Sequence, residues 1–220
     1  MKRILLLLFT IVTLSSCEIQ YDGETRIVAE GQVVDRNNNP IPNQKIEITT
    51  NAEGTYGSTD LISFTTTNQD GRFSLVFPSP KGQDISIETF INSDQRNKFQ
   101  SKIIKGLKKN FINYKLNLNQ IVLYEINDFT ELELVLNKTS PNKQISNIKI
   151  DGIQPDYLVD LNADKNENQF PGKQFNVLKN QTINLSYTLS DFSDPGKVVT
   201  TNHTSVITIN SEKVVHSITY

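Results

Sequence analysis

Alternation of apolar and polar residues with a period of two is the feature that most constrains this chain. It runs from residue 26 to residue 220 and is interrupted by short segments rich in Asn, Asp, Gly and Pro. Successive side chains of a β-strand point to opposite faces, so this period is typical of strands with one buried face. A helical period of 3.6 residues is almost absent. The sequence therefore predicts an all-β fold.

The predicted strands fall into two groups. The first group is 26–35, 44–50, 61–67, 72–77, 84–90 and 113–125, and the second is 129–137, 145–152, 156–162, 174–191, 196–210 and 212–220. Residues 95–110 are basic and less regular, which leaves a long loop, an edge strand or a short helix open. We therefore predict two consecutive β-sandwich domains, 26–125 and 128–220, the second immunoglobulin-like or related.

Two glycines of the first domain indicate local backbone structure. Asp70-Gly71 separates two alternating runs and predicts a β-hairpin, because glycine tolerates the positive φ of tight turns. Gly31 lies inside a predicted strand and indicates a bulge or a close backbone approach. The residues expected in the core share one phase of their strands: Val33, Ile46, Ile48, Phe73, Leu75 and Phe77.

The N-terminal residues predict a secretory signal peptide. Lys2 and Arg3 precede an apolar run over 4–14 that is too short for a membrane-spanning helix, which needs about 20 residues. Leu14-Ser15-Ser16-Cys17 resembles the lipobox of bacterial lipoproteins. The resemblance implies removal of residues 1–16, lipid on Cys17 with acyl chains such as palmitate, and a membrane anchor. Residues 17–25 would form a solvated, lipidated tether.

The charge and the cysteine count limit the partners. The chain has 22 basic and 24 acidic residues, and removal of Lys2 and Arg3 would leave it mildly acidic. Such a chain lacks the basic footprint of a nucleic-acid-binding protein. With Cys17 as the only cysteine, an intrachain disulfide is excluded. The expected partners are a membrane, through the lipid on Cys17, and a protein of the envelope.

The first domain resembles a known family. The stretch GQVVDRNNNPIPNQKIEI, followed by FTTTNQDGRFSLVF, resembles the carboxypeptidase regulatory-like domain, a prealbumin-like β-sandwich. The matching positions are Gly31, Val33, Asp35, Pro40, Pro42, Ile46, Ile48, Thr67, Asp70, Gly71 and Phe73. The resemblance covers 27–124 and implies an accessory domain without catalytic residues. We recognise no family in residues 128–220.

The histidines do not form a recognisable catalytic motif. Nucleophilic catalysis needs a base beside a nucleophile, and His203 and His216 are the only histidines. Both lie in predicted strands, and the chain has no Gly-x-Ser-x-Gly elbow. We therefore expect packing or surface histidines and no enzyme. A hydrolase with its site in the C-terminal half is the second alternative function.

Calcium is the one metal to consider. Asp160, Asn162 and Asp164 occupy alternate positions and Glu167 follows, which resembles the start of an EF-hand or dockerin loop. Lys165 and Pro171 stand where an EF-hand loop has Gly and a bidentate Glu, so a polar turn is the alternative. We expect no other cofactor.

The overall prediction is a lipid-anchored lipoprotein of the bacterial outer membrane, facing the periplasm or the exterior. It would be a non-catalytic binding or scaffolding module, an accessory to a surface uptake or secretion assembly. The first alternative is a carbohydrate- or peptide-binding surface protein. Because the chain has no Trp, the candidate stacking residues, which could equally pack in a core, are Tyr56, Tyr114, Tyr124, Tyr157, Tyr187 and Phe192.

Overall fold

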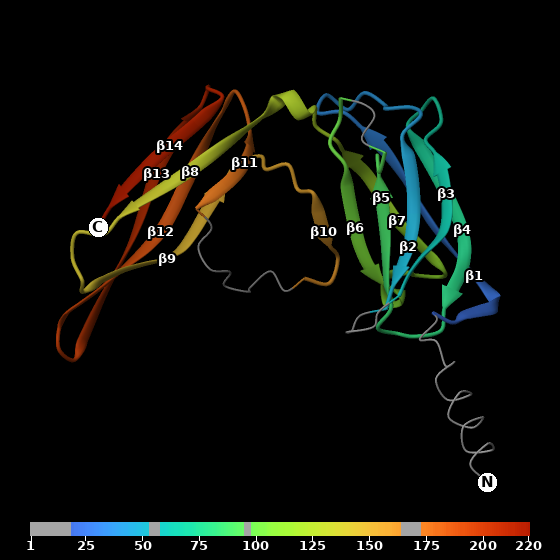
Figure 1. The fold of residues 1–220 in the computed structure, drawn as a ribbon, viewed down its shortest axis with the longest axis horizontal. Coiled ribbons are helices and arrows are strands. Elements are labelled where there is room, and N and C mark those ends of the chain that lie inside the picture. Colours follow the sequence, from blue (N-terminus) through green and yellow to red (C-terminus); the bar gives the residue numbers. More distant parts are fainter. Residues whose placement is uncertain (1–18, 53–57, 95–97, 164–172) are drawn as a thin grey trace, which may run out of the picture. The chain divides into compact units, whose positions relative to one another are not determined.

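The computed structural model describes residues 19–52, 58–94, 98–163 and 173–220. In these ranges the regular elements are β-strands and two short 3-10 helices, which confirms the all-β prediction. The strands form four sheets, and the chain divides into two compact units with two sheets each (Figure 1). Unit 1 contains 19–123 and 157–163, and unit 2 contains 124–156 and 173–220. No helix of the described part is long and apolar enough to cross a membrane.

Unit 1 is built from a three-stranded and a five-stranded sheet. In the first, β1 (Tyr21–Val34) lies between β4 (Arg72–Pro80), which is antiparallel to it, and β7 (Lys115–Val122), which is parallel. The second sheet has the order β10-β6-β5-β2-β3. Its strands are β2 (Lys45–Asn51), β3 (Thr59–Thr66), β5 (Ser86–Ile91), β6 (Lys102–Leu107) and β10 (Leu158–Asp160).

The core of unit 1 contains side chains from both sheets. All six residues that the strand phase placed in a core are in it, so that prediction is confirmed. Ala29 and Ile121 join them from the first sheet, and Ile87 and Ile91 from the second. At about 25 cal/mol for each Å² of apolar surface buried, these side chains are the main source of stability for this unit.

Residues 19–25 belong to the fold, which differs from the solvated tether expected over 17–25. Ile19 is buried, and the amide of Lys81 donates a hydrogen bond of 2.9 Å to the carbonyl oxygen of Gln20. The hydroxyl of Tyr21 donates to the Asp60 carboxylate at 2.9 Å. Ile19 and Tyr21 extend the alternation toward the N-terminus, so β1 begins earlier than predicted.

Gly71 has a φ of +69°, as the Asp70-Gly71 pair predicts, but its turn does not form a hairpin. The flanking strands, β3 and β4, lie in different sheets, so the predicted pairing is wrong. The amide of Val33 donates to the carbonyl oxygen of Gly71 at 2.8 Å. The turn therefore carries the chain from one sheet of the sandwich to the other.

Of the alternatives left open for the irregular segment 95–110, the short helix is present, and the strand is present but not at an edge. Strand β6 is present, followed by the 3-10 helix η1 (Lys108–Asn110). β6 is not an edge strand, because β5 lies on one side of it and β10 on the other.

Unit 2 is built from two three-stranded sheets with the orders β11-β8-β14 and β13-β12-β9. β8 is antiparallel to β11 and parallel to β14, whereas β12 is antiparallel to both of its neighbours. The elements are η2 (Ile126–Asp128), β8 (Phe129–Asn137), β9 (Lys143–Asp151), β11 (Gln174–Leu178), β12 (Gln181–Asp194), β13 (Lys197–Ile209) and β14 (Lys213–Thr219). The core includes Leu132, Leu134, Ile183, Leu185 and Ile209.

The strand predicted over 174–191 is two strands, β11 and β12, in different sheets. The break falls at Lys179 and Asn180, where Asn180 has a φ of +59°. Asparagine adopts this left-handed conformation more readily than most residues. The apolar alternation continues on both sides of the break, which is why the pattern alone does not reveal it.

Residues 157–163 lie in unit 1, although they follow the first strands of unit 2 in the sequence. The amide of Ile103 donates to the Tyr157 carbonyl oxygen at 2.8 Å, and the amide of Leu161 donates to Lys105 at 2.9 Å. Between these bonds, β10 pairs in parallel with β6. The structure thus differs from the uninterrupted second domain expected over 128–220.

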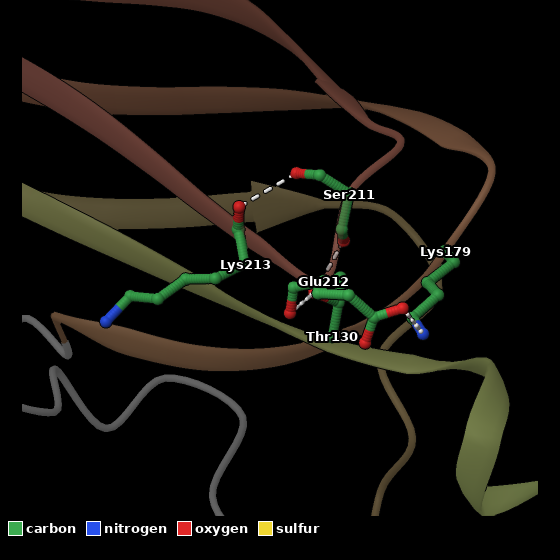
Figure 2. Close-up of polar contacts among 5 residues, drawn as sticks. All are labelled: Thr130, Lys179, Ser211, Glu212 and Lys213. Atoms are coloured by element: carbon green, nitrogen blue, oxygen red, sulfur yellow. Dashed lines mark hydrogen bonds and ion pairs between the residues drawn. The ribbon is translucent and has the colours of Figure 1, made fainter.

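Side chains near the start of β14 fix this strand on β8 (Figure 2). The buried hydroxyl of Thr130 lies 2.9 Å from the carbonyl oxygen of Ser211 and 2.5 Å from that of Glu212. Lys179 Nζ forms an ion pair of 2.9 Å with Glu212 Oε1. The Ser211 hydroxyl donates to the carbonyl oxygen of Lys213 at 2.8 Å. The Thr130 hydroxyl thus gives the backbone carbonyl oxygens of Ser211 and Glu212 a protein donor.

Candidate functional site

The outer face of the β4-β1-β7 sheet carries polar side chains in register. Glu30 of β1 pairs with Ser74 of β4 and Asn117 of β7, and Gln32 pairs with Arg72 and Gln120 in the same way. Alternation brings these side chains to the face opposite the core. Two rows of three polar residues therefore cross the sheet side by side.

These rows line an open groove of about 540 Å³. Its lining residues are Glu30, Gly31, Gln32, Asn68, Arg72, Phe73, Ser74, Asn117, Asn119 and Gln120. Amide side chains are the commonest type in this set. A groove of this volume falls in the range of small-ligand sites, which measure about 300–1,000 Å³.

A β-bulge shapes one wall of the groove. Between Glu30 and Gln32 the register with β7 shifts, so that β7 contributes one residue more than β1. Asn119 has a φ of +53° at this position. A Cβ on Gly31 would lie 3.1 Å from the Phe73 ring and 3.3 Å from the Asn119 carbonyl oxygen. The prediction of a bulge or close approach at Gly31 is confirmed.

Hydrogen bonds orient the amides of the groove. Gln32 Nε2 donates to the Asp70 carbonyl oxygen at 2.9 Å. Asn117 Oδ1 accepts from the amide of Asn119 at 2.9 Å, and Asn68 Oδ1 accepts from that of Arg72 at 2.8 Å. The NH₂ groups of Asn68 and Asn117 keep no protein partner within the described ranges. They can donate to a ligand without breaking a bond.

The groove holds one neutralised and one unpaired charge. Glu30 Oε1 lies 2.7 Å from Lys115 Nζ. The guanidinium of Arg72 makes neither an ion pair nor a hydrogen bond with any other described residue. A guanidinium donates in a planar fork that suits carboxylates and vicinal hydroxyls. The site can thus bind a ligand rich in hydrogen-bonding groups.

The histidines lie on strands of unit 2, as predicted. His203 stacks on Tyr187 with ring centroids 5.2 Å apart and hydrogen-bonds the Thr201 hydroxyl at 2.9 Å. His216 Nε2 lies 3.3 Å from Ser205 Oγ, a serine–histidine pair that the sequence did not reveal. No carboxylate of the described residues hydrogen-bonds either imidazole. The orienting third group of a catalytic triad is therefore missing from this part of the chain.

The calcium candidates are divided between described and undescribed residues. Asp160 Oδ1 accepts the Asn162 amide at 2.8 Å, and Asn162 Nδ2 donates to Asn110 Oδ1 at 3.1 Å. These bonds form a polar turn after β10. Asp164 and Glu167 lie outside the described residues. The described residues contain no cluster of three or more His, Cys, Asp or Glu side chains that could hold a metal ion. The calcium site remains a prediction.

The candidate aromatic residues are dispersed. Tyr187 packs on the core of unit 2, Tyr124 is half-buried, and Tyr56 lies outside the described residues. The exposed ones are Tyr114, Tyr157 and Phe192. None of the five described candidates lines the groove. Leu14, Ser15, Ser16 and Cys17, the candidate lipidation motif, also lie outside the described ranges.

Comparisons with known proteins do not assign the chain to a family. No family model matches it, and no curated protein does. The resemblance to carboxypeptidase regulatory-like domains therefore stays a prediction.

Some solved structures show weak similarity to this chain. The shaft pilin SpaA from Lactobacillus rhamnosus GG, a D295N mutant, is 10% identical over 87% of this chain and 96% of its own, with a TM-score of 0.32. A streptococcal ancillary pilin is 10% identical over 90% and 63%, with a TM-score of 0.31. A 9R-lipoxygenase from Cyanothece PCC8801 is 19% identical, with a TM-score of 0.33, and this chain spans 20% of its length. Similarity of this degree does not assign a function.

Proposed function

We propose that this chain is a lipid-anchored, non-catalytic binding protein of the bacterial cell envelope. Lipid on Cys17 holds it to the outer membrane, and the groove on the β4-β1-β7 sheet binds its ligand. The signal sequence and the motif Leu14-Ser15-Ser16-Cys17 support the anchor. The Ser205–His216 pair, which lacks a hydrogen-bonded carboxylate within the described ranges, supports a role without catalysis.

The observation that carries the binding role is the double row of polar side chains in the groove. A sheet face that only contacts water does not require amide side chains that are aligned across strands and fixed by hydrogen bonds to the backbone. In the groove, Gln32 and Asn117 are held in this way, and the Arg72 guanidinium beside them has no partner among the described residues. Preorganised groups of this kind lose little conformational entropy when a ligand binds.

The ligand class that fits best is a carbohydrate. Sugar hydroxyls both donate and accept, so they match a surface of amide groups together with the Arg72 guanidinium. The groove has no exposed aromatic ring, and Phe73 contributes only a buried one. Affinity would then depend on hydrogen bonds more than on stacking.

Binding can be tested on the purified full chain with a glycan array and titration calorimetry. Arg72→Gln should weaken retention of a bound glycan by about tenfold or more, the effect of one charged hydrogen bond. Arg26→Gln is the matched control, because Arg26 lies on β1 but does not line the groove. An equal loss of glycan binding in both variants would show that the groove is not the binding site. Capture of an envelope membrane protein without any glycan binding would favour the scaffolding role instead.

The anchor needs a separate test. Mass spectrometry of the membrane form should find the wild-type chain cleaved before Cys17 and carrying lipid, and Cys17→Ala should leave the membrane fraction. An unlipidated wild-type chain would exclude the anchor and leave the groove untouched.

A further inference from the structure

Strand β13 presents a long open edge. It lies at one end of the β13-β12-β9 sheet, and β12 is its only partner among the described strands. Every residue from Lys197 to Thr204 is exposed. At an edge of this kind, every second residue directs its backbone N–H and C=O groups away from the sheet, ready to pair with another strand.

The sequence of β13 favours such pairing. Nine of its thirteen residues, all Val, Ile or Thr, are β-branched, and it contains neither Pro nor Gly. Lys197, at one end, is its only charged residue. β-Branched residues favour strands, and low charge removes the usual barrier to association through edges.

The other edges of the described sheets carry protective features that β13 lacks. β4 contains two prolines, and β3, β7 and β9 each contain a shift of register. β10 and β11 have three and five residues. β14 has only seven residues. The β12–β13 pairing shifts only beside the turn, so the edge from Val199 onward is regular. Such features normally prevent association through an edge, and β13 carries none of them from Val199 to Thr204.

We propose that the edge of β13 from Lys197 to Thr204 pairs in antiparallel fashion with the same edge of a second copy of this chain. The bond between Ser205 and His216 limits the free edge at its C-terminal end. Antiparallel pairing about the middle of this segment keeps the two Lys197 side chains apart, whereas parallel pairing in register would set them against each other. In such a twofold dimer, the outward N–H and C=O groups of each β13 edge form hydrogen bonds with those of the other copy.

Site-directed crosslinking of the full chain in detergent tests this geometry. In a twofold antiparallel pair, a residue near the axis faces its own copy at a Cα separation of about 4.5–5.5 Å, within the range for a disulfide. Single cysteines at Thr200, Thr201 and Asn202 should give a covalent dimer at one or two of these positions. Gln144→Cys, on the β9 edge of the same sheet, should stay at the wild-type level. Crosslinking equal to that of Gln144→Cys at all three positions would overturn the proposal.

Sedimentation in the same detergent supplies a test that does not use cysteine. Thr200 on β13 and Gln144 on β9 face the same residue of β12, and so do Asn202 and Ser146. Double variants on the two edges are therefore matched in position. Lysine at 200 and 202 should raise the dimer dissociation constant by about tenfold or more through repulsion between facing charges, whereas lysine at 144 and 146 should not change it. A wild-type chain that is monomeric at all concentrations, or equal loss in both double variants, would overturn the proposal. Circular dichroism would establish that all variants retain the β fold.

Discussion

A Cβ atom on Gly71 would lie 2.3 Å from the carbonyl oxygen of Val33, which is closer than any relaxed contact. The two residues are also joined by the hydrogen bond from the Val33 amide to the Gly71 carbonyl oxygen, at 2.8 Å. The Val33 carbonyl oxygen in turn accepts from Ile41 at 3.0 Å. The turn that joins the two sheets of unit 1 therefore leaves no room for a side chain.

Gly71→Ala should lower the free energy of unfolding by about 2–3 kcal/mol, because it combines a positive φ with a backbone clash. Gly196→Ala is the control: its φ is +102°, but a Cβ there would contact nothing within 4 Å. Gly196→Ala should lower the free energy of unfolding by about 1 kcal/mol, which is the conformational cost alone. Urea denaturation followed by circular dichroism measures both. Equal losses would show that the contact with Val33 relaxes without cost.

Thr130→Val should destabilise unit 2 by about 1–3 kcal/mol, because valine keeps the shape of threonine but removes the hydroxyl that bonds the Ser211 and Glu212 carbonyl oxygens. Glu212→Gln removes the ion pair with Lys179 and should have no measurable effect, since the Glu212 side chain is 92% exposed. Thermal unfolding of the two variants would separate these contributions. If Glu212→Gln lost more thermal stability than Thr130→Val, the hydrogen bonds of Thr130 would not be the stronger contribution.

The sequence predicted strands well because one physical pattern governs them. Burial of alternate side chains placed Ile46 and Ile48 in the core of unit 1 correctly, without any knowledge of their partners. Pairing between strands depends on backbone direction and on distant segments, which the pattern does not contain. This is why the Gly71 turn was predicted as a hairpin, and why the pairing of 157–163 with β6 was not foreseen.

The groove was missed for a related reason. Glu30, Ser74 and Asn117 lie on three strands distant in the sequence, and each by itself is an ordinary solvent-facing residue. Only the register of β4, β1 and β7 brings them into one row. The bulge signal at Gly31 was the single local feature that pointed to this place. The Ser205–His216 contact likewise depends on two strands that belong to different sheets.

Tyr21→Phe should remove an alkaline dependence of stability. Burial raises the pKa of Tyr21 from 10.0 to about 12, Asp60 adds to this effect, and the hydrogen bond with Thr50 opposes it. Because the pKa is higher in the folded state, the stabilisation is complete below a pH of about 10 and is lost as the pH rises toward about 12. Tyr21 is only partly buried, so the loss should be on the order of 1 kcal/mol.

Urea denaturation of the wild type and Tyr21→Phe across this pH range measures the effect as a difference, which cancels the titration of lysines common to both chains. The difference in the free energy of unfolding should be constant up to a pH of about 10 and should then shift against the wild type. A difference that stays constant to a pH of about 12 would show that Tyr21 titrates alike in the folded and unfolded chains.

Tyr114→Gly should stabilise the chain by about 0.5–1 kcal/mol. Asn113 and Tyr114 have φ values of +51° and +66°, in a turn closed by two hydrogen bonds between Ile112 and Lys115. Such a turn favours Asn-Gly, and tyrosine at its second position is strained. Tyr114 is exposed, so little packing is lost with its ring. Tyr114→Ala removes the same ring but keeps the strain, and it should bring no gain in thermal stability. If the glycine and alanine variants unfold at the same temperature, the conformation of Tyr114 is not a source of strain.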